Sequence, residues 1–328
     1  MTSQSTPLPY DLVVVGHLTM DVNVVGGRRL VELGGPPAYA MCTPALGLRR
    51  VGIVSSVGDD FPPGYLRRLA RAGLDLIGLQ RGRVTTHFLN EYSEDGHRTQ
   101  EVTAVADPIR ISDVPETFWR AQWVHVSPVL QEVDLAIITA AKQRRAKVSV
   151  DIQGFVRRIK SDDMKRIEAC PWKGFSRVAR HIDVLKCDVE EIRQLTGRSD
   201  IAAAAASAHK AGSNLVLVTD SIRGSYVCHA STIHHVPAIP PRKTVDHTGC
   251  GDVYAMSFLV EYERSQRPLW SAYFAAASAS FNVETPGATG FPDYDDVAKR
   301  LRAYLSNPEH RSDVEALHDE EGPRPCPI

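Results

Sequence analysis

The stretch Val245-Asp246-His247-Thr248-Gly249-Cys250-Gly251-Asp252, with the apolar segment after it, decides the fold prediction for this chain. Apolar residues follow at Val253, Met256, Leu259 and Val260, which is the spacing of one buried helix face. The Gly-x-Gly turn therefore opens a helix. Backbone N–H groups at a helix N-terminus lack partners within the helix and lie at the positive end of its dipole, so they suit an anion such as a phosphate group.

Asp252 places a carboxylate in this predicted anion site. It is either an N-terminal cap or a base held beside the phosphate that it serves, and a short glycine motif alone leaves both interpretations open. The longer string Asp-x-Thr-Gly-x-Gly-Asp, late in a chain of 328 residues, resembles the second signature of the ribokinase-like (PfkB) sugar and nucleoside kinases. The resemblance implies that Asp252 is the general base. Backbone N–H groups of Gly249, Cys250 and Gly251 would then stabilise the transferred phosphoryl group.

The amino-acid composition limits the classes of protein to which this chain can belong. With 43% hydrophobic and 23% charged residues the chain reads as an ordinary globular protein, and its net charge of −1 gives no attraction to nucleic acid or an acidic membrane. We expect no nucleic-acid partner, no membrane span and a cytoplasmic location. The six cysteines show neither Cys-x-x-Cys spacing nor paired histidines, which argues against a zinc site and a disulfide framework.

Strand and helix patterns alternate along most of the chain, beginning with the apolar run at residues 11–15. Such alternation predicts an α/β fold with a mostly parallel central sheet covered by helices on both faces. Residues 20–33 and 84–105 predict a small β-sheet lid, with a turn at Glu94-Asp95-Gly96. We expect a kinase domain over residues 11–305, a flexible segment at 1–10 and a disordered tail at 306–328. The lid's edge strands suit a homodimer.

Two segments supply candidate residues for the phosphate acceptor. Asp21 follows the first predicted strand, and the paired glycines Gly34 and Gly35 precede a helix, so all three suit contact with a ligand. The family's usual Asn after these glycines is replaced by Ala38-Tyr39, which argues against a simple ribose or fructose substrate. Tyr39 is therefore itself a candidate contact.

The second segment is Asp151-Ile152-Gln153-Gly154-Phe155-Val156-Arg157, directly after a predicted strand. Asp151 and Gln153 together can hold a diol, and Arg157 can clamp phosphate oxygens. A plain strand-end turn with a solvated arginine is the alternative. The string closely resembles the corresponding segment of archaeal myo-inositol 3-kinases, a branch of the same family.

The resemblance also implies a nucleotide and metal site. Asp188 and Glu191 are similar to the family's Asn-x-x-Glu element, which organises Mg²⁺ and phosphate through water, and two carboxylates three residues apart share a helix face. Asp246 and Thr248 would border a monovalent cation such as K⁺, as in some relatives. The remaining residues implied beside the nucleotide are Thr219, Ser221, Gly224, Thr248, Asn282 and Gly287.

These features predict a kinase that moves the γ-phosphoryl group of ATP, with Mg²⁺, onto a hydroxyl of a small polyol. Myo-inositol is the first expectation. Fructose, 2-keto-3-deoxygluconate and nucleosides stay open, since Tyr39, Phe88 and Tyr92 offer an aromatic platform for a base. A non-catalytic ligand sensor on the same fold is the alternative from another class. A nicotinamide dehydrogenase is disfavoured, because it would require Gly-x-Gly-x-x-Gly after the first strand and Gly16 is followed by His-Leu-Thr instead.

Overall fold

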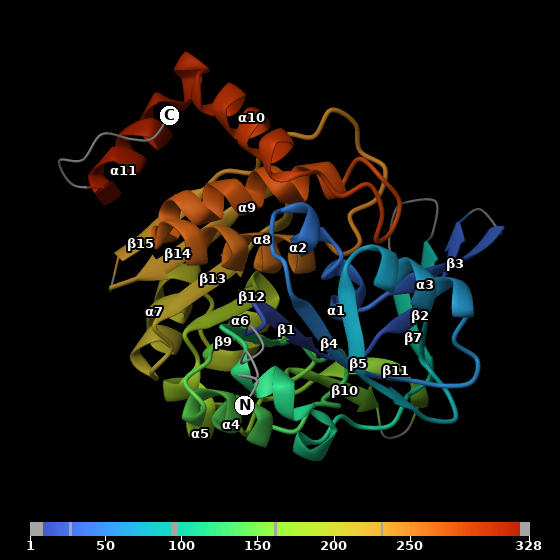
Figure 1. Cartoon of the computed structure of the whole chain (residues 1–328). Coiled ribbons are helices and arrows are strands. Elements are labelled where there is room, and N and C mark those ends of the chain that lie inside the picture. The colour runs from blue at the N-terminus through green and yellow to red at the C-terminus, as the bar shows by residue number, and fades with distance from the viewer. Residues whose placement is uncertain (1–8, 26–27, 93–97, 161–162, 231, 322–328) are drawn as a thin grey trace, which may run out of the picture.

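The computed structural model describes residues 9–25, 28–92, 98–160, 163–230 and 232–321 (Figure 1). Its centre is a nine-stranded sheet in the order β15-β14-β13-β12-β9-β8-β1-β4-β5. Neighbouring strands run parallel except at the β13–β14 and β14–β15 pairs, which are antiparallel. The strands are β1 (Leu12–Val15), β4 (Val51–Val57), β5 (Leu74–Arg81), β8 (Trp123–Val126), β9 (Lys147–Asp151), β12 (Val184–Asp188), β13 (Leu215–Thr219), β14 (Ser225–His229) and β15 (Thr232–Val236).

Both faces of this sheet are buried, which explains its continuous apolar runs. In β1 the side chains of Leu12 and Val14 enter one hydrophobic cluster, whereas those of Val13 and Val15 enter a second cluster on the opposite face. The first cluster includes residues of α1 (Pro36–Tyr39), α2 (Cys42–Ala45), α3 (Pro63–Arg71), α8 (Cys250–Ser265), α9 (Pro268–Asn282) and α10 (Tyr294–Leu305). The second includes residues of α4 (Ala136–Gln143), α5 (Phe175–Val178), α6 (Val189–Thr196) and α7 (Ile201–Lys210). The predicted fold class is confirmed.

A second sheet of six strands, in the order β10-β11-β7-β6-β2-β3, forms the lid beside the central sheet (Figure 1). Residues 20–33 and 84–105 supply β2 (Thr19–Val25), β3 (Arg28–Gly34), β6 (Thr86–Tyr92) and β7 (Arg98–Ala104). The sequence did not predict the pair β10 (Arg157–Lys160) and β11 (Asp163–Ala169), because its residues are largely charged and the apolar alternation is weak. The turn at residues 94–96 lies outside the described residues.

The tail differs from its prediction as well. Residues 311–321 form α11 (Arg311–Glu321), where disorder was predicted. The reason is tertiary contact: Leu317 is buried in the core, and the Glu320 carboxylate accepts hydrogen bonds from the backbone N–H groups of Leu269 and Trp270 at the start of α9. At the other end Tyr10 is buried against Phe118, while residues 1–8 and 322–328 lie outside the described part.

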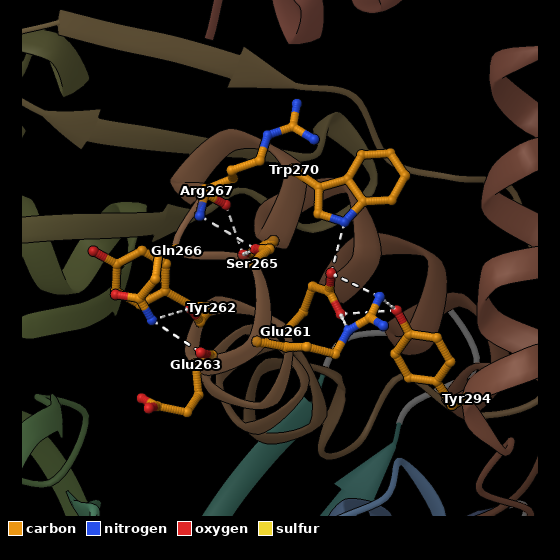
Figure 2. Close-up of polar contacts among 10 residues, drawn as sticks. Glu261, Tyr262, Glu263, Ser265, Gln266, Arg267, Trp270 and Tyr294 are labelled. Atoms are coloured by element: carbon orange, nitrogen blue, oxygen red, sulfur yellow. Dashed lines mark hydrogen bonds and ion pairs between the residues drawn. The ribbon is translucent and has the colours of Figure 1, made fainter. Parts of the chain in front are cut away.

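Helix α8 carries the glycine turn, and a buried carboxylate anchors its far end (Figure 2). Glu261 is fully buried and accepts hydrogen bonds from Trp270 Nε1 at 2.7 Å, Tyr294 Oη at 3.0 Å and Arg264 Nε at 3.1 Å. These bonds tie α8 to α9 and α10, so the position of its N-terminus is fixed by the core. Among the described residues no helix is long and apolar enough to cross a membrane.

Candidate active site

The first turn of α8 has the geometry that an anion site requires. Gly249 is the N-cap residue with φ 75°, and a Cβ there would lie 2.0 Å from the Tyr39 ring, so only glycine fits. Within the described residues the N–H groups of Gly249 and Gly251 donate no hydrogen bond, whereas the N–H of Cys250 donates to His247 O at 3.3 Å. Two of the three predicted amides are therefore open.

This turn borders a cavity of about 510 Å³ that lies between the central sheet and the lid. Most of the predicted residues reach it, including Asp252 and the turn before it. The predicted residues that line the cavity are Asp21, Gly35, Tyr39, Gln153, Arg157, Asp188, Glu191, Thr219, Ser221, Gly224, Thr248, Gly249, Cys250, Gly251 and Asp252. The structure does not place Gly34, Asp151, Asn282 or Gly287 on its wall.

Asp252 has the properties of a base. Its Oδ1 atom is buried and has no hydrogen-bond partner within the described part of the chain. Burial, with the negative charge of Asp151, raises the pKa of Asp252 to about 7, against the opposing charges of Lys186 and Arg157. A carboxylate with a pKa close to neutrality, facing a cavity, can accept a proton from a bound hydroxyl.

The prediction that Asp151 contacts the substrate is wrong, because this residue does not line the cavity. The side chain is fully buried, and its Oδ2 pairs with Lys186 Nζ at 2.7 Å. Lys186 does line the cavity, and its ammonium lies 3.0 Å from where a Cβ on Gly251 would be. The sequence reasoning missed this cation. A lysine that directly follows Val184 and Leu185 in a predicted buried strand was the available signal, since a buried lysine needs a charged partner.

Arg157 and Gln153 lie together on the cavity wall as predicted. Arg157 Nε donates to Val129 O at 2.7 Å, and its Nη2 is 3.4 Å from Gln153 Oε1. Gln153 Nε2 in turn donates to Ser127 Oγ at 3.3 Å. These bonds hold the guanidinium in one orientation at the cavity, where it can meet anionic oxygens.

On the acceptor side, Asp21 lines the cavity and its Oδ1 accepts a hydrogen bond from Thr19 Oγ1 at 2.8 Å. Gly34 lies directly against Asp21, since a Cβ on Gly34 would be 2.3 Å from Asp21 Oδ2. Its role is to leave room for the carboxylate. Tyr39 Oη is buried without a hydrogen-bond partner in the described chain, so a bound ligand could satisfy it.

Two residues expected at the nucleotide brace the glycine turn instead. Asn282 Nδ2 donates to Thr248 O at 2.8 Å, and the N–H of Gly287 donates to Asp246 Oδ2 at 2.9 Å. The cavity that Thr219, Ser221 and Gly224 line also has small apolar walls. They are formed by Ala238, Ile239, Ala276, Ala279 and Val283. Such walls suit a flat aromatic base.

Asp188 and Glu191 form a capping box at the start of α6: the Glu191 N–H donates to Asp188 Oδ1 and the Asp188 N–H to Glu191 Oε2, each at 2.7 Å. Burial and the charge of Asp151 raise the pKa of Glu191 to about 8. The described residues contain no cluster of three or more His, Cys, Asp or Glu side chains that could hold a metal. One oxygen of each carboxylate is left for water, which fits Mg²⁺ held mainly by phosphate oxygens and water.

Strands β6 and β7 of the lid also contribute Phe88, Asn90 and Gln100 to the cavity wall. Phe88 was expected as a platform, and the side chain of Tyr92 lies outside the described part. The two amides were not predicted, because alternation of polar residues on a strand is also the pattern of a solvated sheet face.

Comparison with known proteins identifies the family. The model of the pfkB family of carbohydrate kinases matches residues 10–293. A cytidine kinase of Thermococcus kodakarensis is 32% identical over 265 residues, covering 79% of this chain and 90% of that protein. Two solved structures share the fold.

One is a pyrophosphate-dependent kinase of the ribokinase family complexed with a pyrophosphate analog and myo-inositol; its TM-score is 0.73 at 24% identity, over 88% of this chain and 99% of that one. The other is the Arabidopsis thaliana ribokinase complexed with ribose and ATP, with a TM-score of 0.73 at 22% identity, over 90% and 99%. With its glycine turn, buried aspartate and cavity in place, the chain belongs to the PfkB family of ribokinase-like carbohydrate kinases, which are phosphotransferases with a hydroxyl group as acceptor.

Proposed function

We propose that this chain transfers the γ-phosphoryl group of ATP to a sugar hydroxyl of a nucleoside, with Asp252 as general base. The observation that carries the reaction is the Asp252 carboxylate, which faces the cavity with one buried oxygen unpaired, next to the open amides of the α8 turn. The acceptor class is supported by the likeness to a cytidine kinase over 90% of that protein, and by Phe88 with two amide side chains on the cavity wall.

In the proposed reaction the acceptor oxygen attacks the γ-phosphorus while its proton passes to Asp252. A new O–P bond forms, and the bond from the γ-phosphorus to the bridging oxygen of ADP breaks. The N–H groups of Gly249 and Gly251, with the Lys186 ammonium, lie where they would stabilise charge on the phosphoryl oxygens. Arg157 supplies a second positive charge from the lid side. Mg²⁺, held by phosphate oxygens and by water on Asp188 and Glu191, would neutralise further charge.

ATP is proposed as donor because the cavity has a part built for a base. Ala238, Ile239, Ala276 and Ala279 line it beside Thr219. A donor without a base, such as pyrophosphate, would leave these walls without a contact. A K⁺ site beside Asp246 and Thr248 stays a prediction from the family resemblance.

Myo-inositol is the second candidate acceptor. The segment 151–157 closely resembles that of archaeal myo-inositol 3-kinases, and its Gln153 and Arg157 both line the cavity. The amide of Gln153 would then contact ring hydroxyls.

The test is a coupled assay of ADP release with ATP and Mg²⁺ across nucleosides, myo-inositol, fructose and 2-keto-3-deoxygluconate. Asp252→Asn should lower kcat by about 10²–10⁴ and leave ATP affinity nearly unchanged. Turnover within a few-fold of wild type would remove Asp252 from the role of base. ATP binding with ADP release that no acceptor stimulates would favour the ligand sensor.

A further inference from the structure

Three amide side chains form a row across the lid sheet. Asn23 on β2, Asn90 on β6 and Gln100 on β7 occupy directly paired register positions. Asn90 Nδ2 donates to Asn23 Oδ1 at 2.9 Å, and Gln100 Nε2 donates to Asn90 Oδ1 at 2.9 Å. At the other end Asn23 Nδ2 donates to Glu32 Oε2 at 2.5 Å. Asn90 and Gln100 line the cavity, so the row ends at the cavity wall.

Glu32 fixes the orientation of each side-chain amide in this row. An ionised carboxylate only accepts hydrogen bonds, so Asn23 must turn its NH₂ group toward Glu32 and its oxygen toward Asn90. Asn90 then turns its NH₂ group toward Asn23 and its oxygen toward Gln100. Gln100 is left with Oε1 and one N–H, and in the described chain Oε1 accepts no hydrogen bond. Turning the Gln100 amide over would place Gln100 Oε1 against Asn90 Oδ1, and both of these oxygens are acceptors.

We propose that Gln100, oriented from Glu32 through the amide row, selects nucleosides whose base carries an amino group. This inference rests on the proposed nucleoside kinase function and names the base within it. Gln100 offers an acceptor beside a donor, which complements an exocyclic NH₂ beside an unprotonated ring nitrogen, the edge of cytosine and adenine. Uracil and hypoxanthine present a carbonyl beside an N–H, which is the reverse pattern. Phe88 and Val129, also on the cavity wall, supply apolar contact for the ring.

The discrimination follows from the cost of reversing the row. To pair with uracil in the same pose, Gln100 must turn its amide and lose the bond to Asn90, or all three amides must turn and set Asn23 Oδ1 against the Glu32 carboxylate. Both choices bring like-charged atoms together in a buried setting, since Asn23 and Asn90 are buried. An amide that pairs with a base through two bonds discriminates by about 5- to 100-fold.

The experiment measures kcat/KM of the full chain with ATP for cytidine against uridine, and for adenosine against inosine. Wild type should prefer the amino-bearing member of each pair by about 5- to 100-fold. Gln100→Leu should bring both ratios close to one. Glu32→Gln should also lower them, because a terminal amide can donate as well as accept and no longer sets the direction.

Thr99→Ala is the matched control, since Thr99 is the exposed neighbour of Gln100 on β7, and it should leave the ratios unchanged. Thermal melting of each variant separates lost folding from lost selectivity. The inference is overturned if wild type shows no preference, or if Gln100→Leu and Glu32→Gln both keep it. Phosphorylation of myo-inositol without any nucleoside would overturn this inference and leave the kinase reaction standing. No acceptor-stimulated ADP release at all would overturn both.

Discussion

Lys186 Nζ lies 2.7 Å from Asp151 Oδ2, with both side chains buried under the first turn of the helix that carries the proposed base. Burial acts to lower the pKa of Lys186, but the negative charges of Asp151, Glu191 and Asp252 raise it above its ordinary value. The ammonium therefore stays charged. Asp151 thus acts at the cavity through Lys186, by fixing a positive charge beside the anion site.

Removing this cation should affect both stability and activity. Lys186→Met leaves Asp151 buried without its partner, and we expect a loss of about 3–5 kcal/mol in the free energy of unfolding. The double variant Lys186→Met with Asp151→Asn removes both charges and should recover most of that loss. Its kcat/KM should still fall about 10²-fold or more, since the charge near the phosphoryl group is gone. Denaturant unfolding and ADP release check the two effects; wild-type kinetics in the double variant would make the pair purely structural.

Activity should depend on pH through Asp252. The proposed base accepts a proton only when ionised, and its pKa is raised to about 7 by burial and Asp151. Below that pH the carboxyl is mostly protonated, so kcat/KM should fall about ten-fold per unit as pH decreases. A pH profile of kcat/KM at fixed ionic strength measures this. A curve that stays flat down to about pH 5 would mean that no group with this pKa is required.

The same pKa makes a prediction about stability. A carboxyl whose pKa rises from 3.8 to about 7 on folding binds its proton more tightly in the folded state. Stability contributed by this group is therefore present at low pH and lost as pH rises through about 7. Asp252→Asn should stabilise the protein by about 1–4 kcal/mol above that pH and by little at about pH 4. Denaturant titrations at both pH values test this; equal effects would show that Asp252 carries no raised pKa.

Arg157 should not be replaceable by lysine. Its Nε and Nη2 atoms are held by Val129 O and Gln153 Oε1, which directs the guanidinium at the cavity. Lysine keeps the charge but lacks this fork, so Arg157→Lys should lower kcat/KM by about 10- to 100-fold with little change in Tm. Arg158→Lys is the matched control, because Arg158 is exposed and pairs with Glu168 on the lid. Equal kinetics in the two variants would return Arg157 to a structural role.

The fold was predictable wherever burial produces a strong pattern. The apolar runs of β1, β4 and β13 are buried on both faces, and sequence periodicity alone locates such strands. Sequence periodicity does not predict the structure of a segment that is ordered by contacts with residues far away in the sequence. Residues 311–321 look like a polar tail, yet Leu317 and Glu320 find their contacts on α9. A local sequence window contains no information on such partners.

The residues of the site fall into the same two groups: those that a local motif predicts, and those whose placement depends on distant parts of the chain. Asp252 and the glycine turn are close in sequence, so their motif predicted their placement at the cavity. Lys186 and Asp151 meet only because β12 and β9 are adjacent in the sheet. Likewise Asn282 and Gly287 bind the backbone of the turn or Asp246, and Gly34 makes room for Asp21. The family resemblance indicated the right region for these residues, but which of them contacts a ligand depends on tertiary geometry.

The lid edge supports the predicted dimer. β3 is an edge strand, and its neighbouring residues Leu30 and Val31, on opposite faces, are 60% and 50% exposed. An edge strand with exposed apolar residues is a site for pairing with another chain, and a second copy is the simplest partner. We expect sedimentation at twice the 36.1 kDa of one chain, and Leu30→Asp should shift it to the monomer. Ile77→Asp is the control, since Ile77 is 57% exposed on β5, the edge of the other sheet, and should leave the dimer intact. A wild-type chain that sediments as a monomer at micromolar concentration, or a Leu30→Asp variant that stays dimeric, would show that the lid edge does not mediate association.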